Sequence, residues 1–314
     1  MQTVLDHIGN TPLVRLAHIG RDLPVPVLVK CEHLNPGGSI KDRIALAIVD
    51  DAERRGLLRP GMTLIEATAG NTGVGLALVA AARGYWLVCA MPEKMSADKR
   101  NALRAMGARV VITPNAPPSS PDNFQNVARR MAEEHGWFLT DQFETPANIR
   151  AHEEGTAQEL LDQVEAPIGA FVSGAGTGGT ITGVGRRLKA IDPRTRVVLA
   201  DPVGSGLAHW VETGELGPDG PYEVEGIGAS KVPGNLDRAV IDSAERVTDE
   251  ESFAMVRRLV REEGLTVGGS AGANLVAALR VAARGDLHGP VITVMCDSWD
   301  RYRAKPWMQG WVDA

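Results

Sequence analysis

The chain has 314 residues, of which 44% are apolar and 23% charged, and this balance is typical of a soluble globular protein. Its 33 basic and 39 acidic residues leave a net charge of −6, which gives no indication of binding to nucleic acid or to an anionic membrane surface. The length exceeds what one hydrophobic core usually holds and therefore predicts two domains.

The cysteines and the apolar segments exclude other classes. Cys31, Cys89 and Cys296 are far apart and form no Cys-x-x-Cys or Cys/His cluster, so neither a disulfide framework nor a metal site is expected. The first ten residues carry charged side chains and lack the apolar centre of a signal peptide. The longest apolar runs are too short to span a bilayer. We therefore expect a cytoplasmic protein.

Strand-like and helix-like segments alternate along the chain. In chain order we predict a strand at 25–31, a helix at 40–55, a strand at 63–67, a helix at 72–83, a strand at 85–91, a helix at 97–106, a strand at 109–113, a helix at 121–134, a strand at 137–141, a helix at 147–163, a strand at 169–173, a helix at 180–190, a strand at 196–200, helices at 249–263 and 271–283, and a strand at 291–296. Short strands between amphipathic helices imply an α/β fold with parallel sheets covered on both faces.

Two segments interrupt this alternation. Residues 115–121 form a proline-rich surface loop, and residues 202–235 form a long irregular stretch rich in glycine. A loop as long as the second is usually functional or disordered. In a parallel sheet of this kind, ligands bind beyond the carboxyl ends of the strands.

The first candidate functional segment is Gly37–Arg43, which has the sequence GGSIKDR and precedes a predicted helix. The glycine pair favours a turn, and Lys41 then lies in the first turn of the helix. The positive end of the helix dipole there favours the neutral amine that a Schiff-base lysine must offer. A solvated surface lysine is the alternative, and the neighbouring Asp42 weakens the effect of the dipole.

A second segment, Thr68–Gly73, lies directly between a predicted strand and a predicted helix. Small hydroxylated residues and backbone N–H groups at a helix N-terminus suit an anion, and a carboxylate would fit. The alternative is an ordinary turn in which Asn71 caps the helix.

A third segment, Gly174–Thr180, also joins a strand to a helix and satisfies the pattern GxGxxG. Together with Asp201 at the end of the next strand it matches a dinucleotide-binding fingerprint. Its position past the middle of the chain and the adjacent Pro202 favour a cup for a single phosphate instead. In such a cup Thr177 and Thr180 would add hydroxyl groups to the backbone N–H groups.

A fourth segment, Gly268–Gly272, opens the predicted helix at 271–283. Ser270 could simply be the N-cap of this helix. As a functional residue, its hydroxyl group could instead face a heterocyclic nitrogen.

Several motifs follow one another in a defined order along nearly the whole chain: Gly9–Leu13, Gly38–Arg43, Gly70–Gly73, Asp141–Phe143, Pro146–Asn148, Gly176–Thr180, Gly226–Gly228 and Gly269–Gly272. In this order they resemble the fold-type II pyridoxal-phosphate enzymes of the cysteine synthase and cystathionine β-synthase family. The resemblance implies two three-layer αβα domains with parallel-rich sheets and the cofactor in the cleft between them. Residues 1–42 and 146–314 would form the larger, cofactor-binding domain, and residues 43–145 the smaller, mobile substrate-binding domain.

The resemblance also implies roles for single residues around pyridoxal 5'-phosphate. Lys41 would be the catalytic Schiff-base lysine, Asn71 would contact the ring oxygen of the cofactor, and Ser270 would face its pyridine nitrogen. The phosphate would be held by Gly176, Thr177, Gly178, Gly179 and Thr180. The substrate would be contacted by Thr68, Ala69, Gly70, Asn71, Thr72, Gln142 and Gly226. Relatives usually carry serine at the position of Ala69, which leaves the identity of the substrate open.

The activity implied is β-replacement on serine or an O-activated serine through an aminoacrylate intermediate, with sulfide or a small thiol as the nucleophile. A serine beside the pyridine nitrogen agrees with this activity, because a serine leaves the ring neutral. A neutral ring favours elimination over long-lived carbanions. Residues 226–229, with Pro233, Asn235 and Leu236, look more like cysteine synthase. Residues 92–96 and 222–226 look more like cystathionine β-synthase, which takes serine and homocysteine.

Other chemistries and classes stay open. Within the family they are cyanide or ammonia as nucleophile, O-phosphoserine as substrate, and deamination of the threonine type. A nicotinamide-dependent oxidoreductase is a distant alternative based on the GxGxxG pattern, and a non-catalytic protein of the same fold is another. The family resemblance also leads us to expect a homodimer that binds small amino-acid substrates, with neither nucleic-acid nor membrane partners.

Overall fold

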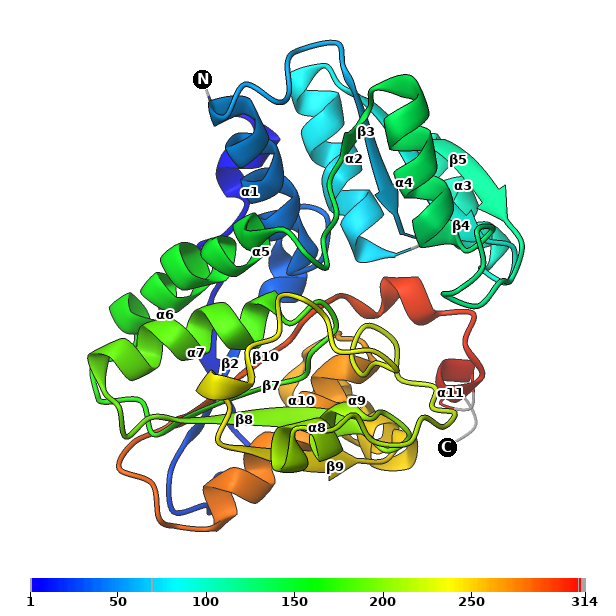
Figure 1. Cartoon of the computed structure of the whole chain (residues 1–314). Coiled ribbons are helices and arrows are strands. Elements are labelled where there is room, and N and C mark those ends of the chain that lie inside the picture. Colours follow the sequence, from blue (N-terminus) through cyan, green and yellow to red (C-terminus); the bar gives the residue numbers. More distant parts are fainter. Residues whose placement is uncertain (1, 69, 310, 312–314) are drawn as a thin grey trace. The chain divides into compact units, whose positions relative to one another are not determined.

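The computed structural model describes residues 2–68, 70–309 and 311, and it divides into two compact units (Figure 1). Unit 1 consists of Met1–Ile8 and Asn35–Asn148, and unit 2 consists of Gly9–Leu34 and Ile149–Ala314. The predicted division into a cofactor-binding domain and a mobile substrate-binding domain stays a prediction. None of the helices in the described part of the chain is long and apolar enough to cross a bilayer.

Unit 1 is built on a parallel sheet with the strand order β5-β4-β3-β6. Its strands are β3 (Thr63–Ala67), β4 (Trp86–Pro92), β5 (Arg109–Thr113) and β6 (Phe138–Leu139). Its helices are α1 (Lys41–Arg54), α2 (Asn71–Arg83), α3 (Ala97–Ala105) and α4 (Phe124–His135), and a short 3-10 helix covers Val4–His7. Alternation along β3 sends Leu64 into one apolar cluster with α1, α2 and α3, and Ile65 into another with α4, so helices cover both faces.

Unit 2 is built on a sheet with the strand order β1-β2-β10-β7-β8-β9, in which β1 runs antiparallel to β2 and the remaining pairs are parallel. Its strands are β1 (Leu13–Arg15), β2 (Val27–Lys30), β7 (Ala170–Ser173), β8 (Arg196–Pro202), β9 (Ser243–Val247) and β10 (Val291–Val294). Its helices are α6 (Ala157–Gln163), α7 (Gly179–Ile191), α8 (Leu207–Thr213), α9 (Asp249–Glu263), α10 (Gly269–Ala283) and α11 (Pro306–Gln309).

Helices also cover both faces of the sheet in unit 2. Along β8, Val198 and Ala200 pack into the apolar cluster that contains α9 and α10. Val197 and Leu199 point the other way, into the cluster with α7 and α8. The predicted α/β fold with parallel-rich sheets in two units is therefore confirmed. The predicted location of the cofactor stays a prediction.

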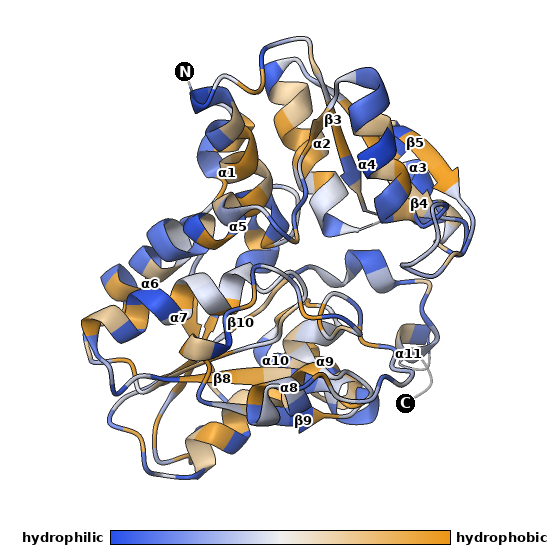
Figure 2. Ribbon diagram, viewed as in Figure 1, coloured by the Kyte–Doolittle hydropathy of each residue, from blue (hydrophilic) through white to orange (hydrophobic). Residues whose placement is uncertain are grey.

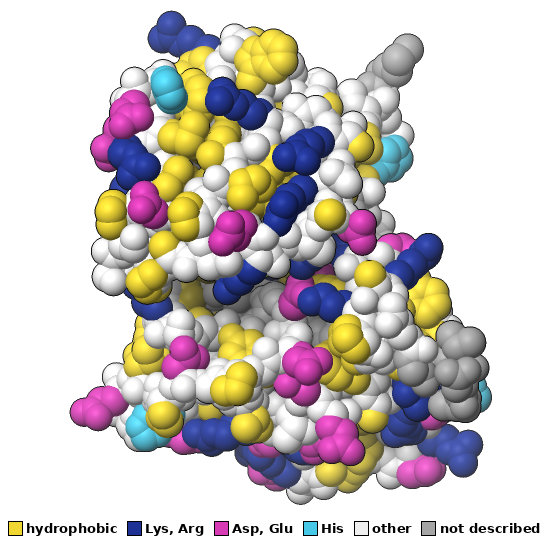
Figure 3. All heavy atoms as spheres, turned by 90° about the vertical axis from the view of Figure 1, so that its right-hand side faces the viewer, with side chains coloured by type: hydrophobic (Ala, Val, Ile, Leu, Met, Phe, Trp, Pro, Cys, Tyr) yellow, Lys and Arg dark blue, Asp and Glu magenta, His cyan; other side chains and the backbone are white. Residues whose placement is uncertain are grey.

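Hydropathy and charge follow this layering. Figure 2 shows hydrophobic colours along β8, which is buried, and hydrophilic colours on the visible side of α4. On the face drawn in Figure 3, Lys and Arg side chains lie among Asp and Glu side chains. Mixed charge of this kind agrees with the small net charge of the chain.

The predicted elements differ from the observed ones in a few places. The helix predicted at 147–163 is divided into α5 (Pro146–Arg150), a π-helical segment Ala151–Thr156, and α6. The irregular stretch 202–235 contains α8, and the edge strands β1 and β9 are not predicted. The short α8 and the edge strands share one cause, since such elements carry too few apolar residues to show a period.

Candidate functional site

The turn before α1 places Lys41 at the first position of that helix. Gly37 N donates to Asp42 Oδ2 at 2.5 Å, and Lys41 N donates to Ser39 Oγ at 3.2 Å. Gly38 has a φ of +74°, the left-handed conformation that favours glycine. The buried Asp42 thus points back at the turn, whereas Lys41 is half-buried. The predicted place of Lys41 in the first turn is confirmed, and its Schiff-base role stays a prediction.

The loop between β3 and α2 leaves the N-terminus of α2 without a side-chain cap. Gly70 is the N-cap residue, and its N–H donates to Thr68 Oγ1 at 3.2 Å. Asn71 and Thr72 occupy the first turn, so the alternative in which Asn71 caps the helix is wrong. The first N–H groups of a helix lack partners within the helix and attract anions. Ala69 lies outside the described residues, and its contact with the substrate stays a prediction.

Gln142 joins this loop to the segment that follows β6. Thr72 Oγ1 donates to Gln142 Oε1 at 2.6 Å, so two predicted substrate-binding residues are in direct contact. Both are buried, at 3% and 5% exposure. Asn148 Nδ2 donates to the carbonyl oxygen of Gln142 at 2.8 Å and fixes the backbone there. Unit 1 thus gathers Thr68, Gly70, Thr72 and Gln142 around one helix N-terminus.

Sequence reasoning misses Glu66, whose carboxylate accepts a hydrogen bond from Gln142. Glu66 is in β3 with 2% exposure, and Gln142 N donates to its Oε2 at 3.1 Å. Burial raises the pKa of Glu66, against hydrogen bonds from Thr140, Gln142 and Ala67 that lower it. A single charge inside the apolar strand predicted at 63–67 is the signal that could have found it.

In unit 2, the segment Gly174–Thr180 leads into α7 and contains glycines that the fold requires. A Cβ on Gly176 would lie 2.3 Å from the carbonyl oxygen of Gly226. Gly178 has a φ of +86°, and a Cβ there would lie 2.7 Å from the backbone of Leu236. Close packing therefore requires glycine at these two positions. It does not compete with anion binding, because the same tight turn leaves backbone N–H groups at the start of a helix.

The residues present at this helix start fit a phosphate. The N-cap of α7 is Gly178, with no side-chain cap hydrogen bond, and the first turn carries no acidic residue. Thr180 Oγ1 lies 3.2 Å from Nε2 of the buried His152, whose Nδ1 lies 3.0 Å from Thr156 Oγ1. The hydroxyl group of Thr180 is thus held at the helix start. Sequence reasoning misses His152, because nothing in its local pattern marks it.

Ser270 is a buried residue in the first turn of α10. The N-cap of this helix is Gly268, so the alternative in which Ser270 caps it is wrong. Asn274 in this helix bonds to two residues of the sheet segments. Its Oδ1 accepts from Gly174 N at 2.7 Å, and its Nδ2 donates to the carbonyl of Val294 at 2.8 Å. Asn274 therefore ties the start of α10 to the glycine loop. Sequence reasoning misses this asparagine.

Gly226 lies in the long loop between β8 and β9 and has a φ of +88°. A Cβ at this position would meet no atom within 4 Å. The loop is held beside it: Asp249 accepts from Glu223 N and Val224 N at 2.8 and 2.9 Å, and Lys305 Nζ lies 2.5 Å from Glu225 Oε1. Backbone conformation, and not packing, is what favours glycine at 226.

Asp201 argues against the dinucleotide reading of the glycine loop. Its side chain is fully buried, and its Oδ2 accepts from Ala208 N in α8 at 2.7 Å. Burial raises the pKa of this carboxyl group. A ribose-binding carboxylate has to reach a ligand, whereas Asp201 serves the start of α8. The single-phosphate cup remains the better explanation.

Comparison with known proteins gives one consistent picture. Residues 4–297 match the family described as "Pyridoxal-phosphate dependent enzyme". The chain is 43% identical to a "Cystathionine beta-synthase" of Apis mellifera over 100% of its own length but only 62% of that protein. It is 43% identical to a "Cysteine synthase" of Staphylococcus aureus over 95% of this chain and 94% of that one. Among solved structures, that of O-ureido-L-serine synthase matches with a TM-score of 0.91 at 40% identity, covering 99% of this chain and 96% of the other.

Proposed function

The chain belongs to the family of pyridoxal-phosphate dependent enzymes, and from this premise we propose that it catalyses β-replacement on serine or an O-activated serine. Sulfide or a small thiol is the proposed nucleophile, which makes the activity cysteine synthase-like. The observation that carries the proposal is the contact between Thr72 and Gln142 at the uncapped N-terminus of α2. Such an arrangement suits the carboxylate of an amino acid.

The cofactor, when bound, supplies an electron sink that stabilises negative charge at the Cα atom of the substrate. Unit 2 supports its binding through the N–H groups of Gly176–Thr180, with the hydroxyl groups of Thr177 and Thr180 as further donors. In our proposal Ser270 faces the ring nitrogen, and a hydroxyl group brings no negative charge to that position. Asn71 would contact the ring oxygen of the cofactor.

Lys41 is the proposed proton carrier of the reaction. With the cofactor bound, Lys41 Nζ would take the proton from the substrate Cα and later return it. Lys41 occupies the first position of α1, directly after the glycine turn, and this fixed place in the chain supports the role. The carboxylate of Asp42 accepts a hydrogen bond from the N–H of Gly37 in the turn before the helix.

The choice of nucleophile separates two candidates. Relatives with both names are about equally similar to this chain. Cystathionine β-synthase activity, with serine and homocysteine, is the second candidate, and it is supported by the sequence of residues 222–226. A homodimer located in the cytoplasm is our expectation for the working protein.

A matrix of substrates tests the proposed function. Purified protein saturated with pyridoxal 5'-phosphate is given serine, O-acetylserine or O-phosphoserine, each with sulfide or homocysteine, and products are identified by mass spectrometry. We expect cysteine from at least one donor with sulfide, and none from the Lys41→Ala variant. Cystathionine alone would favour the second candidate. No thioether or thiol product from any pair would contradict β-replacement.

A further inference from the structure

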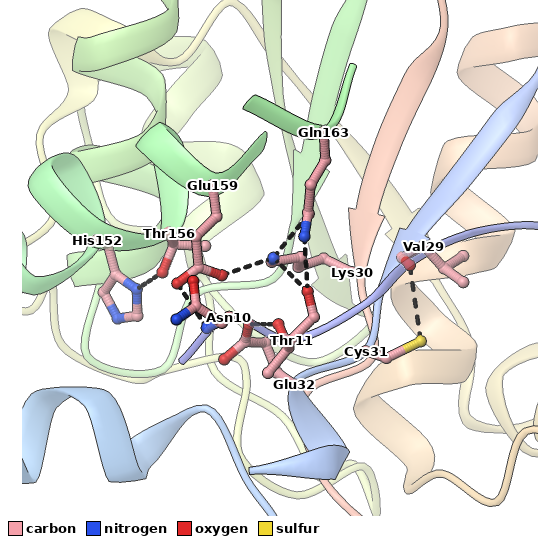
Figure 4. Close-up of polar contacts among 10 residues, drawn as sticks. All are labelled: Asn10, Thr11, Val29, Lys30, Cys31, Glu32, His152, Thr156, Glu159 and Gln163. Carbon is pink, nitrogen blue, oxygen red and sulfur yellow. Dashed lines mark hydrogen bonds and ion pairs between the residues drawn. The ribbon is translucent and has the colours of Figure 1, made fainter. Parts of the chain in front are cut away.

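His152 is a buried imidazole that the proposed function does not use. It lies in the π-helical segment Ala151–Thr156 with 2% exposure, and both of its ring nitrogens lie within hydrogen-bonding distance of a threonine hydroxyl group. Nδ1 lies 3.0 Å from Thr156 Oγ1 (Figure 4), and Nε2 lies 3.2 Å from Thr180 Oγ1. His152 therefore connects a threonine of the core to a threonine at the proposed phosphate site.

Close packing of two helical segments keeps His152 beside Thr180. A Cβ on Gly183, which lies in α7 with Thr180, would be 2.4 Å from the carbonyl oxygen of Ile149 and 3.0 Å from His152 Cβ. The π-helical segment thus approaches α7 as closely as only a glycine allows. The backbones of the two segments, and not their side chains alone, fix the distance between the imidazole and the hydroxyl group.

The buried Thr156 determines which ring nitrogen of His152 carries a proton. Thr156 is fully buried, and within the described part of the chain its hydroxyl group has no hydrogen-bond partner other than His152 Nδ1. A buried hydroxyl proton without an acceptor is costly. Thr156 therefore donates to Nδ1, which must be unprotonated to accept. An imidazole in this state carries its proton on Nε2.

This tautomer leaves the hydroxyl proton of Thr180 available for a ligand. Nε2 donates to Thr180 Oγ1, so the hydroxyl group receives one hydrogen bond and keeps its own proton. Among the described residues, this hydroxyl group has no second partner. In the opposite tautomer, Nε2 would accept the proton of Thr180. A phosphate accepts hydrogen bonds, so only the first tautomer lets Thr180 bind it as a donor.

We propose that His152 is a positioning residue, fixed in one tautomer by Thr156, that directs the hydroxyl proton of Thr180 to the phosphate of pyridoxal 5'-phosphate. This inference rests on the proposed function for the place of the phosphate at the start of α7. It adds that three donors in series, from Thr156 through His152 to Thr180, end at the phosphate. None of the three needs a positive charge for this role.

The first test measures how His152 contributes to cofactor affinity. His152→Leu removes both hydrogen bonds, whereas His152→Gln carries a donor and an acceptor on one terminal carbon and can replace both ring nitrogens. Fluorescence titration of the apoprotein with pyridoxal 5'-phosphate should show about fivefold weaker binding for His152→Leu and affinity within about twofold of wild type for His152→Gln. Equally weak binding by both variants would overturn the proposal.

A matched control separates this role from a general loss of stability. Thr293 is as deeply buried as Thr156, and its Oγ1 donates to the carbonyl of Val172 at 2.7 Å. Thr293→Val also removes a buried hydrogen bond of unit 2, and it should keep the cofactor affinity within about twofold of wild type. Equal losses of affinity in His152→Leu and Thr293→Val would contradict a specific role of His152.

Two further comparisons assign the loss to the phosphate and to Thr180. Pyridoxal, which lacks the phosphate, should bind to His152→Leu and to wild type with affinities within about twofold of each other. In the background of Thr180→Val, His152→Leu should add less than about twofold to the loss, because the hydroxyl group that it holds is gone. A full loss in that background, or an equal loss for pyridoxal, would overturn the proposal.

The tautomer is tested without measuring affinity. In ¹⁵N NMR of the histidine-labelled holoprotein, His152 should carry its proton on Nε2 and none on Nδ1, and His152→Gln identifies its signals by their loss. Should the His152 variants not fold, Thr156→Val identifies the signals, because Nδ1 loses its donor, and the tautomer then decides the inference. A proton on Nδ1 in wild type would overturn it.

The failure of this inference is distinguishable from the failure of the proposed function. If Thr180→Val leaves the cofactor affinity unchanged, the phosphate lies elsewhere, and both the phosphate site and the role of His152 are wrong. If Thr180→Val weakens binding and His152→Leu does not, only the role of His152 is wrong. The proposed reaction is decided separately, by the products of the substrate matrix.

Discussion

Two deeply buried charged side chains, Lys30 in unit 2 and Glu66 in unit 1, are satisfied in opposite ways. In unit 2, the fully buried Lys30 is neutralised by Glu159 Oε2 at 2.6 Å and also donates to the carbonyl of Thr11 and to Gln163 Oε1, at 2.6 and 2.9 Å (Figure 4). In unit 1, Glu66 is held by neutral donors, and burial raises its pKa. Lys30 thus has a partner of opposite charge, whereas Glu66 accepts hydrogen bonds from neutral groups.

The difference indicates what each charge does. Glu159 also accepts from Asn10 N at 2.9 Å, where Asn10 has a φ of +47°, so the Lys30–Glu159 pair pins the turn before β1 (Figure 4). A paired buried charge of this kind fixes a conformation. An unpaired buried carboxylate is costly and tends to occur where chemistry or binding needs it. We therefore expect Lys30 to matter for stability and Glu66 for the site.

The largest effect is expected from Lys30→Met, which leaves Glu159 without its cation. Breaking a buried pair by removing one partner costs about 3–5 kcal/mol of unfolding free energy. Chemical denaturation measures the loss, and kcat per folded molecule should stay unchanged. The double variant Lys30→Met/Glu159→Leu should recover part of the stability. A loss below about 1 kcal/mol in Lys30→Met would mean that the pair does not pin the turn.

A smaller effect with a characteristic pH dependence is expected from Glu66→Gln. The folded pKa of Glu66 is raised above its ordinary value of 4.5, so the folded state binds the proton more tightly than the unfolded state. Wild type therefore loses stability as pH rises from the ordinary pKa through the folded pKa. The variant lacks this component, so its stability relative to wild type should improve with rising pH. A relative stability that falls with pH would contradict the direction of the shift.

Two threonines of α7 lie in different surroundings: Thr180 is at the proposed phosphate site, and Thr182 is in the core. Thr180→Val should weaken binding of pyridoxal 5'-phosphate about tenfold, because a donor to an anion is lost. Thr182 Oγ1 accepts from Asp237 N at 3.0 Å in the buried interior, so Thr182→Val should lower stability and leave cofactor affinity within about twofold. Fluorescence titration of the apoprotein with pyridoxal 5'-phosphate measures the cofactor affinity of both variants. If the two variants bind the cofactor with equal affinity, Thr180 does not contribute to the phosphate site.

The smallest effect is expected from Lys305→Ala. Lys305 Nζ lies 2.5 Å from Glu225 Oε1, but the two side chains are 41% and 31% exposed. Exposed pairs contribute about 0–1 kcal/mol, since water screens them. A loss as large as that of Lys30→Met would show that burial does not separate the two pairs, and the comparison would fail.

Much of the fold follows from local pattern. The strands at 63–67 and 109–113 and the helix at 249–263 coincide with β3, β5 and α9. These elements are long or strongly periodic, and Thr248 and Gly264 mark the two ends of α9. The short α8 and the edge strands β1 and β9 are missed, because pairing with a neighbouring strand or helix, and not local period, defines them.

The site divides in the same way. Loops that open helices are visible in the sequence, so Lys41 and the segment Gly176–Thr180 could be proposed from it. The contact of Thr72 with Gln142 spans 70 positions, and that of Glu66 with Gln142 spans 76. No local pattern connects residues so far apart. Only the parallel order of β3 and β6 brings their carboxyl ends together.

The most direct test of the account is the identity of the lysine that carries the cofactor. Lys30 is fully buried and engaged with Glu159, Thr11 and Gln163, whereas Lys41 is half-buried at the start of α1. Borohydride reduction of the holoprotein, followed by digestion and mass spectrometry, should place the pyridoxyl group on Lys41. A pyridoxyl group on Lys30 or on any other lysine would contradict the proposed site.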